Sequence, residues 1–99
     1  MVGSMDELQA RVQQQVYRMQ DLREAMSGVR GRETSEDGNV TVEVDGNGAL
    51  RDLAFTSGIS RLTPDELERA VVGTAAAAAR TAFEQRADLV RRFTDELAP

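Results

Sequence analysis

The side chains of this sequence that can do chemistry are carboxylates, hydroxyls, one tyrosine and arginines. Its 99 residues hold 17 acidic and 12 basic side chains; every basic residue is an arginine, and histidine, cysteine, lysine and tryptophan are absent. Thiolate nucleophiles, disulfides, Cys/His zinc sites, histidine triads and lysine Schiff bases are therefore excluded. Because no pair of carboxylates is expected to converge in an apolar pocket, we expect no enzymatic activity and no cofactor.

Four oxygen-bearing side chains, Asp37, Asn39, Asp45 and Asn47, have the residue types of a calcium site. They lack the loop closed by a bidentate glutamate that calcium-binding helix-loop-helix motifs use. Turn formation accounts for all four, since Asp and Asn side chains hydrogen-bond their own backbone in turns. We expect no metal site.

The arginines are the groups suited to binding phosphate. Arg69, Arg80 and Arg91 recur every 11 residues, which places them within about 40° of one another on a helix. Arg11 and Arg18, one heptad apart, form a second candidate pair. The alternative is that each arginine of the first set pairs with an acidic neighbour three or four residues away, in turn Glu66, Glu84 and Asp88. A net charge of −5 and an isoelectric point near 4.7 favour this alternative.

The elements that must position these side chains fit one domain, residues 1–99. Residues 4–28 are predicted to form a helix, with Ser4 and Glu7 as a capping box and Gly28 at its end. Its apolar side chains follow a heptad pattern broken only by Gln15. These apolar positions form a seam along the helix. Two interpretations of the seam remain: it covers the sheet of its own chain, or it packs against a second chain.

Residues 29–62 change to a period of two and predict a three-stranded sheet. Val40, Val42 and Val44 alternate with polar residues, as in a half-buried strand. The following turn, Asp-Gly-Asn-Gly at 45–48, predicts a tight hairpin in which at least one glycine has a positive φ. Residues 50–56 then form the next strand, and residues 30–35 a polar edge strand.

Residues 63–98 predict a long helix, capped by Thr63 and Glu66 with Pro64 in its first turn. About 34 helical residues would span about 50 Å, whereas a compact domain of about 100 residues is about 30–35 Å across. Two apolar stripes run along this helix, and one small sheet cannot cover both. We therefore expect a homodimer whose interface uses Val72, Phe83, Val90 and Leu97 of this helix and Met5, Leu8, Val12, Met19 and Leu22 of the first.

The hairpin at residues 38–48, Gly-Asn-Val-Thr-Val-Glu-Val-Asp-Gly-Asn-Gly, is followed by Leu-Arg-Asp-Leu-Ala-Phe at 50–55 and by an alanine-rich helix. In this order the elements resemble the YbaB/EbfC family of bacterial nucleoid-associated proteins. The resemblance implies an α+β fold of the order α-β-β-β-α, a dimer with helices projecting like tweezers, and DNA binding with little sequence specificity. The chain departs from the family pattern at residues 36–38, where many members have a glycine run, and at residues 76–78, where Asn-Asp-Ala is frequent.

Two functions from different classes follow. The first is a cytoplasmic, nucleoid-associated homodimer that binds duplex DNA weakly and with little sequence preference. The second is a protein-interaction module on the same fold, secretion-associated or chaperone-like, which does not bind DNA; the acidic net charge favours it. No apolar run is long enough to cross a membrane, and no small-molecule substrate is expected.

Overall fold

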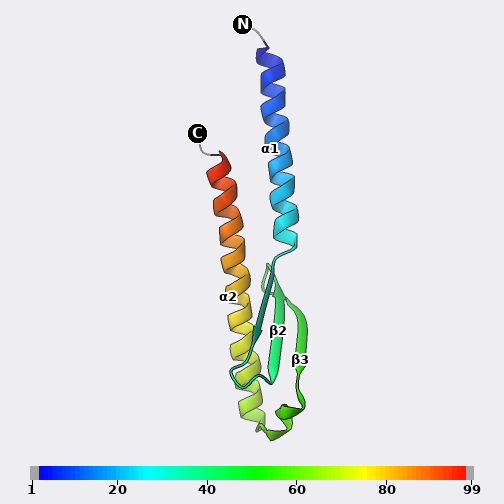
Figure 1. The fold of residues 1–99 in the computed structure, drawn as a ribbon, viewed down its shortest axis with the longest axis vertical. Helices are drawn as coiled ribbons and strands as arrows, with labels where there is room; N and C mark the ends of the chain where they lie inside the picture. Colours follow the sequence, from blue (N-terminus) through cyan, green and yellow to red (C-terminus); the bar gives the residue numbers. More distant parts are fainter. Residues whose placement is uncertain (1–2, 98–99) are drawn as a thin grey trace.

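The computed structural model describes residues 3–97, the side chain of Leu97 excepted. In chain order the elements are α1 (Ser4–Ser27), β1 (Arg30–Thr34), β2 (Val40–Asp45), β3 (Leu50–Phe55), the 3-10 helix η1 (Ser57–Arg61) and α2 (Pro64–Leu97) (Figure 1). The expected order α-β-β-β-α is confirmed. Helix η1 is an addition that the sequence pattern did not indicate, and Ala98, the predicted last residue of the second helix, lies outside the described residues.

The three strands form an antiparallel sheet in the order β1-β2-β3. Helix α2 packs along β1 and β2 (Figure 1). The alternation predicted for β2 is confirmed, because Val40, Val42 and Val44 are buried and the residues between them are half-buried. These valines and three residues outside β2 make up the hydrophobic core of the described chain: Val29, Val40, Val42, Val44, Ala78 and Ala82.

Strand β1 approaches α2 closely at Gly31. A Cβ atom built on Gly31 would lie 1.9 Å from the carbonyl oxygen of Ala78 and 2.8 Å from the amide nitrogen of Ala82. Only a residue without a side chain fits there, because the neighbouring atoms belong to the helix backbone. The small side chains of the alanine-rich helix thus let the strand lie against it.

Strand β3 carries apolar side chains that its own chain leaves uncovered. Leu53 and Phe55 pair directly opposite Val42 and Val40, so they share the face of the sheet on which α2 packs. They are nevertheless 37% and 45% exposed, and Leu50 is 60% exposed. The single helix α2 is too narrow to cover all three strands.

The hairpin turn between β2 and β3 has the expected geometry. Gly48 has a φ of 81°, a value that glycine adopts without steric cost. The Asp45 carboxylate accepts hydrogen bonds from the amides of Asn47 (2.9 Å) and Ala49 (3.0 Å). The predicted positive-φ glycine is therefore Gly48, whereas Gly46 has no positive φ.

One of the two predicted capping boxes forms. The Thr63 hydroxyl accepts from the amide of Glu66 (3.2 Å), and the Glu66 carboxylate accepts from the amide of Thr63 (3.0 Å). The box predicted for Ser4 and Glu7 is wrong: Ser4 is already helical, Gly3 occupies the N-cap position in a left-handed conformation, and no side chain caps the helix. The Glu7 amide instead donates to the carbonyl oxygen of Gly3 (2.6 Å).

Helix α1 does not cover the sheet of its own chain. It continues away from β1, and only its C-terminal part lies beside α2 (Figure 1); none of its residues is buried. The described chain measures 76 × 19 × 15 Å with a radius of gyration of 20.6 Å, whereas a compact domain of this length has about 12.6 Å. The first of the two uses left open for the apolar seam is therefore wrong.

Candidate nucleic-acid interface

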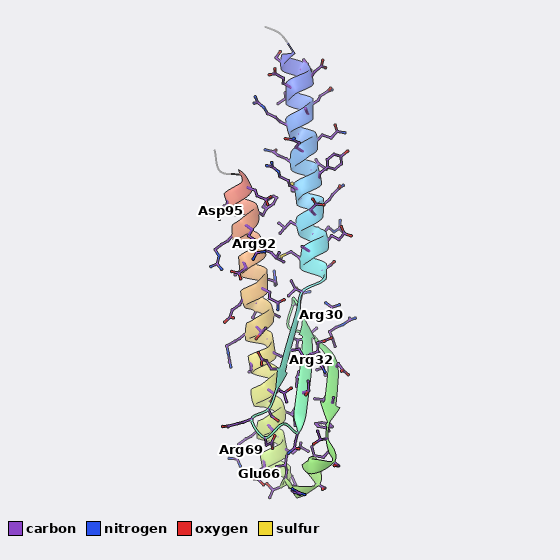
Figure 2. All side chains as sticks on the ribbon, in the orientation of Figure 1. Arg30, Arg32, Glu66, Arg69, Arg92 and Asp95 are labelled. Atoms are coloured by element: carbon purple, nitrogen blue, oxygen red, sulfur yellow. The ribbon has the colours of Figure 1, made fainter. Side chains whose placement is uncertain are left out.

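The three arginines predicted on one face of α2 are all exposed. Figure 2 shows Arg69 beside Glu66 near the start of α2. At the rise of an α-helix, Arg69, Arg80 and Arg91 are distributed over about 33 Å of its length. They form a line of separated positive charges along the helix and share no pocket.

The acidic neighbours neutralise this face only in part. Asp88 makes an ion pair with Arg91, the one pair among the three considered that the described residues contain. The Glu66 carboxylate is engaged with Thr63 in the capping box, and the Arg69 guanidinium donates to the carbonyl oxygen of Asp65 (3.4 Å). Arg69 and Arg80 therefore remain available to an anion in solution.

The second predicted pair lies on α1, where Arg11 and Arg18 are exposed. The Arg18 guanidinium donates to the carbonyl oxygen of Glu96 (3.4 Å) at the end of α2. Arg18 and Arg92 line a cleft between the two helices. The structure thus places Arg18 near the last turns of α2, whereas Arg11 lies further along the part of α1 that extends beyond it.

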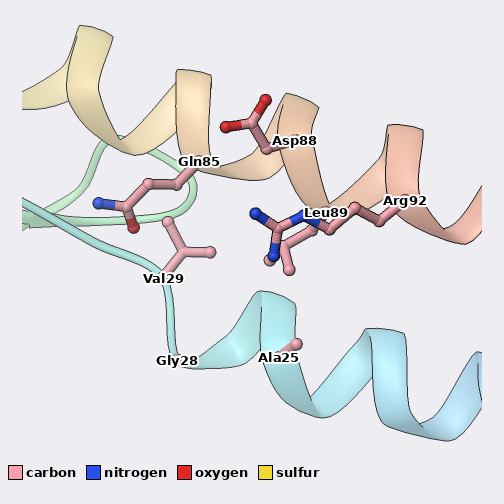
Figure 3. A pocket seen from close by; sticks show the side chains of 7 residues that line it. All are labelled: Ala25, Gly28, Val29, Gln85, Asp88, Leu89 and Arg92. Atoms are coloured by element: carbon pink, nitrogen blue, oxygen red, sulfur yellow. The ribbon is translucent and has the colours of Figure 1, made fainter.

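Another hollow, of about 240 Å³, lies between the C-terminal end of α1 and the facing part of α2 (Figure 3). Val29 and Leu89 contribute apolar side chains to it, and Asp88 and Arg92 of α2 contribute one charge of each sign. The two charges cancel, and Val29 and Leu89 belong to the hydrophobic core or pack against it. We therefore interpret this hollow as a gap in the packing of the two helices.

Sequence reasoning missed a group of arginines at the tip of the β2–β3 hairpin. A hollow of about 340 Å³ is lined by four of them, Arg23, Arg30, Arg51 and Arg86, and by Asp45 as its single acidic residue. The arginines come from α1, β1, β3 and α2. The register of β1 on β2 places Arg30 opposite Asp45, and Arg51 is the second residue of β3, just after the turn. The other two arginines are brought in by the packing of the helices.

The residues predicted for the dimer interface are mostly exposed. On α2, Val72, Phe83 and Val90 are 63%, 46% and 45% exposed. On α1, Leu22 is half-buried and the other four predicted residues are exposed: Met5, Leu8, Val12 and Met19. The side chain of Leu97 lies outside the described part of the chain.

The carboxyl groups with shifted pKa serve turns and helix ends. Hydrogen bonds from the amides of Ala49 and Asn47 lower the pKa of Asp45, those from Thr63 lower the pKa of Glu66, and those from Ser35 and Asn39 lower the pKa of Asp37. A general acid needs the opposite shift at neutral pH. Across residues 3–97, no three potential metal-ligating side chains gather, and no helix is long and apolar enough to span a bilayer.

Comparison with known proteins gives a structure and a family. The chain resembles the crystal structure of the uncharacterized protein HP0035 from Helicobacter pylori with a TM-score of 0.68 and 17% identity, over 90% of this chain and 95% of that one. At this identity the likeness shows the fold alone. No curated protein matches the chain. The model of the YbaB/EbfC DNA-binding family matches residues 2–97. The chain therefore belongs to the YbaB/EbfC DNA-binding family.

Proposed function

We propose that this chain is a nucleoid-associated protein that binds duplex DNA as a homodimer and with little sequence preference. The observation that carries the proposal is its membership of a DNA-binding family over nearly its whole length. The exposed arginines of α2 supply the chemistry, because guanidinium groups bind backbone phosphates. Phosphate contacts are the same for every base sequence, which is why the expected preference is small.

The homodimer is supported by the amount of surface that one copy leaves exposed. Its accessible surface is 7398 Å², whereas a compact monomer of this mass exposes about 5,500 Å². The excess is about 1,900 Å², enough for each copy to contribute its half of a stable interface, which is about 800 Å². A second copy is the occupant we favour for this surface.

The exposed apolar residues of α2 and β3 form a surface shaped for such a partner. Val72, Phe83 and Val90 are spaced by 11 and 7 residues, so they fall within about 20° on one stripe of the helix. The Phe83 ring lies against the turn that leads into β3, since a Cβ atom on Gly48 would be 3.1 Å from it. This stripe and the open face of β3 therefore meet, and the same surface on a second copy can cover both.

The test is a binding titration of the whole chain with short duplexes of different base composition over a range of salt concentrations. We expect dissociation constants in the non-specific range of about 10⁻⁴–10⁻⁶ M and a slope of log K against log salt on the order of −2 to −5. A double variant, Arg69→Gln with Arg80→Gln, removes the two arginines of the α2 line that are free of ion pairs within residues 3–97, and it should weaken binding to all duplexes alike and flatten the slope. A strong preference for one duplex would contradict the proposed lack of specificity.

The second candidate function is a protein-interaction module without DNA binding. The observation that favours it is the net charge of −5, which opposes approach to a polyanion. The same titration separates the two functions. Absence of binding at about 20 mM salt, where screening is weak, would reject the DNA role and leave the interaction module.

A further inference from the structure

The hollow at the tip of the β2–β3 hairpin gathers positive charge in an acidic protein. Four arginines and one aspartate line it, a net charge of +3, in a chain whose total is −5. Like charges held close together repel one another, so this cluster of guanidinium groups opposes folding. A bound anion would remove that cost.

Two of the arginines are held in place by the backbone. The Arg30 guanidinium donates from one nitrogen to the carbonyl oxygens of Val29 (2.8 Å) and Ser27 (3.3 Å). The Arg86 guanidinium donates to the carbonyl oxygen of Gly46 (2.9 Å). Each guanidinium has five N–H donors, so most donors remain for a ligand. Both groups are oriented before a ligand arrives, which reduces the entropy lost on binding.

The acidic side chain of the hollow is already occupied. Asp45 accepts the two turn hydrogen bonds from Asn47 and Ala49. The ion pairs within residues 3–97 join Arg32 to Glu43 and Asp52, and Arg91 to Asp88. None of them involves an arginine of the hollow, so its positive charge is not neutralised by ion pairing within the chain.

The residues that line the hollow are suited to binding a phosphate group of a nucleic acid and not one of its bases. Paired guanidinium donors match the oxygens of a phosphate in bidentate geometry. The remaining lining residues are Met26, Ser27, Gly46 and Asn47, and none of them is aromatic, so no side chain offers a ring on which a base could stack. Arg23 and Arg51 are exposed to solvent, whereas Arg30 and Arg86 are half-buried, so a phosphate would first meet Arg23 and Arg51.

We infer that this arginine hollow binds the phosphodiester backbone of duplex DNA, with Arg23 and Arg51 reaching phosphate oxygens from its rim and Arg30 and Arg86 from positions held by the backbone. The inference rests on the proposed function and specifies where that function is carried out. It adds a contact site at the hairpin tip to the separated arginines of α2.

The test compares two double variants that remove the same charge. Arg23→Gln with Arg51→Gln removes the two exposed arginines of the hollow, and neither side chain takes part in a hydrogen bond or ion pair within the part of the chain that the structure describes. Arg61→Gln with Arg92→Gln is the control, since both residues are exposed, lie outside the hollow and take no part in the ion pairs described above. We expect the first variant to weaken DNA binding at least tenfold and to make the salt slope less negative by about 0.9 for each phosphate lost. The control should change binding no more than about threefold, through screened long-range charge.

Equal losses in the two variants would overturn the inference and leave the proposed function standing. A wild type that binds no DNA would instead reject the proposed function itself. NMR of the arginine Nε–Hε groups in the wild type provides a measurement independent of the variants: the signals of Arg30 and Arg86 should shift on addition of a short duplex, whereas that of Arg61 should not. If inorganic phosphate alone produces the same shifts at the same phosphate concentration, the hollow is a site for free anions and the assignment to DNA is wrong.

Discussion

Replacement of Gly31 by alanine tests the close packing of β1 on α2. The added Cβ atom would lie 1.9 Å from the Ala78 carbonyl oxygen and 2.8 Å from the Ala82 amide nitrogen. An ordinary non-bonded contact is about 3.5 Å, so the strand or the helix would have to move by about 1.5 Å. Because both neighbouring atoms are backbone, no side chain can rotate to relieve the overlap.

We expect Gly31→Ala to lower the free energy of unfolding by about 3 kcal/mol, the upper part of the range for overpacked cores. Gly73→Ala is a matched control with the opposite expected sign. Gly73 lies inside α2, and a Cβ atom there would have no neighbour within 4 Å. Alanine should therefore raise the free energy of unfolding by about 0.5–1 kcal/mol through its higher helix propensity.

Urea denaturation followed by circular dichroism measures both changes. All samples are compared at one protein concentration, because the stability of the proposed dimer would depend on it. With a slope of about 1.5 kcal/mol per molar urea, a loss of about 3 kcal/mol moves the unfolding midpoint down by about 2 M. A Gly31→Ala protein that unfolds at the wild-type midpoint would refute the close approach of strand and helix. Destabilisation by Gly73→Ala of similar size would show that the effect is not specific to the strand contact.

Three further outcomes are expected. Light scattering should show a dimer at tens of micromolar, and Val90→Asp should produce monomers by placing a charge in the apolar stripe; a wild-type monomer would reject the homodimer. Gly48→Val should cost more than about 1 kcal/mol in a thermal melt because Gly48 has a φ of 81°, and an unchanged melting temperature would reject the turn assignment. The lowered pKa values of Asp45 and Glu66 mean that their stabilisation is present above their ordinary values of 3.8 and 4.5 and is lost as the pH falls below them; Glu66→Gln should reduce this acid sensitivity, and an unchanged pH profile would contradict it.

The features that sequence reasoning predicted correctly depend on neighbouring residues. The alternation of Val40, Val42 and Val44 identifies a half-buried strand because side chains of a strand point to opposite faces in turn. Thr63 and Glu66 form their box because three residues separate a cap from its partner in the first turn. The same local rule fails at Ser4 because Ser4 is already helical and the N-cap position falls on Gly3, which has no side chain to form the box.

The features that sequence reasoning missed or left open depend on how distant segments meet. The heptad pattern of α1 shows that the helix has an apolar side but not what covers it. The arginine hollow joins residues as far apart as Arg23 and Arg86, and nothing in their spacing relates them. The α2 arginines were found from their period, and the structure shows two of the three free of the ion pairs considered for them.

An acidic protein can bind DNA when its charges are separated in space, because screening limits the reach of the remaining acidic residues to about 10 Å at moderate salt. Each hollow has room for few phosphates, so one copy would bind weakly. Two copies joined through the α2 stripe would present two hollows on one rigid body, and the second contact would then be intramolecular. On this view the exposed apolar surface and the arginine hollow serve the same function, because the first would join two copies and the second would bind DNA in each copy. Dimerisation would then join two weak phosphate sites into one binding surface, and DNA affinity should depend on the concentration of dimer.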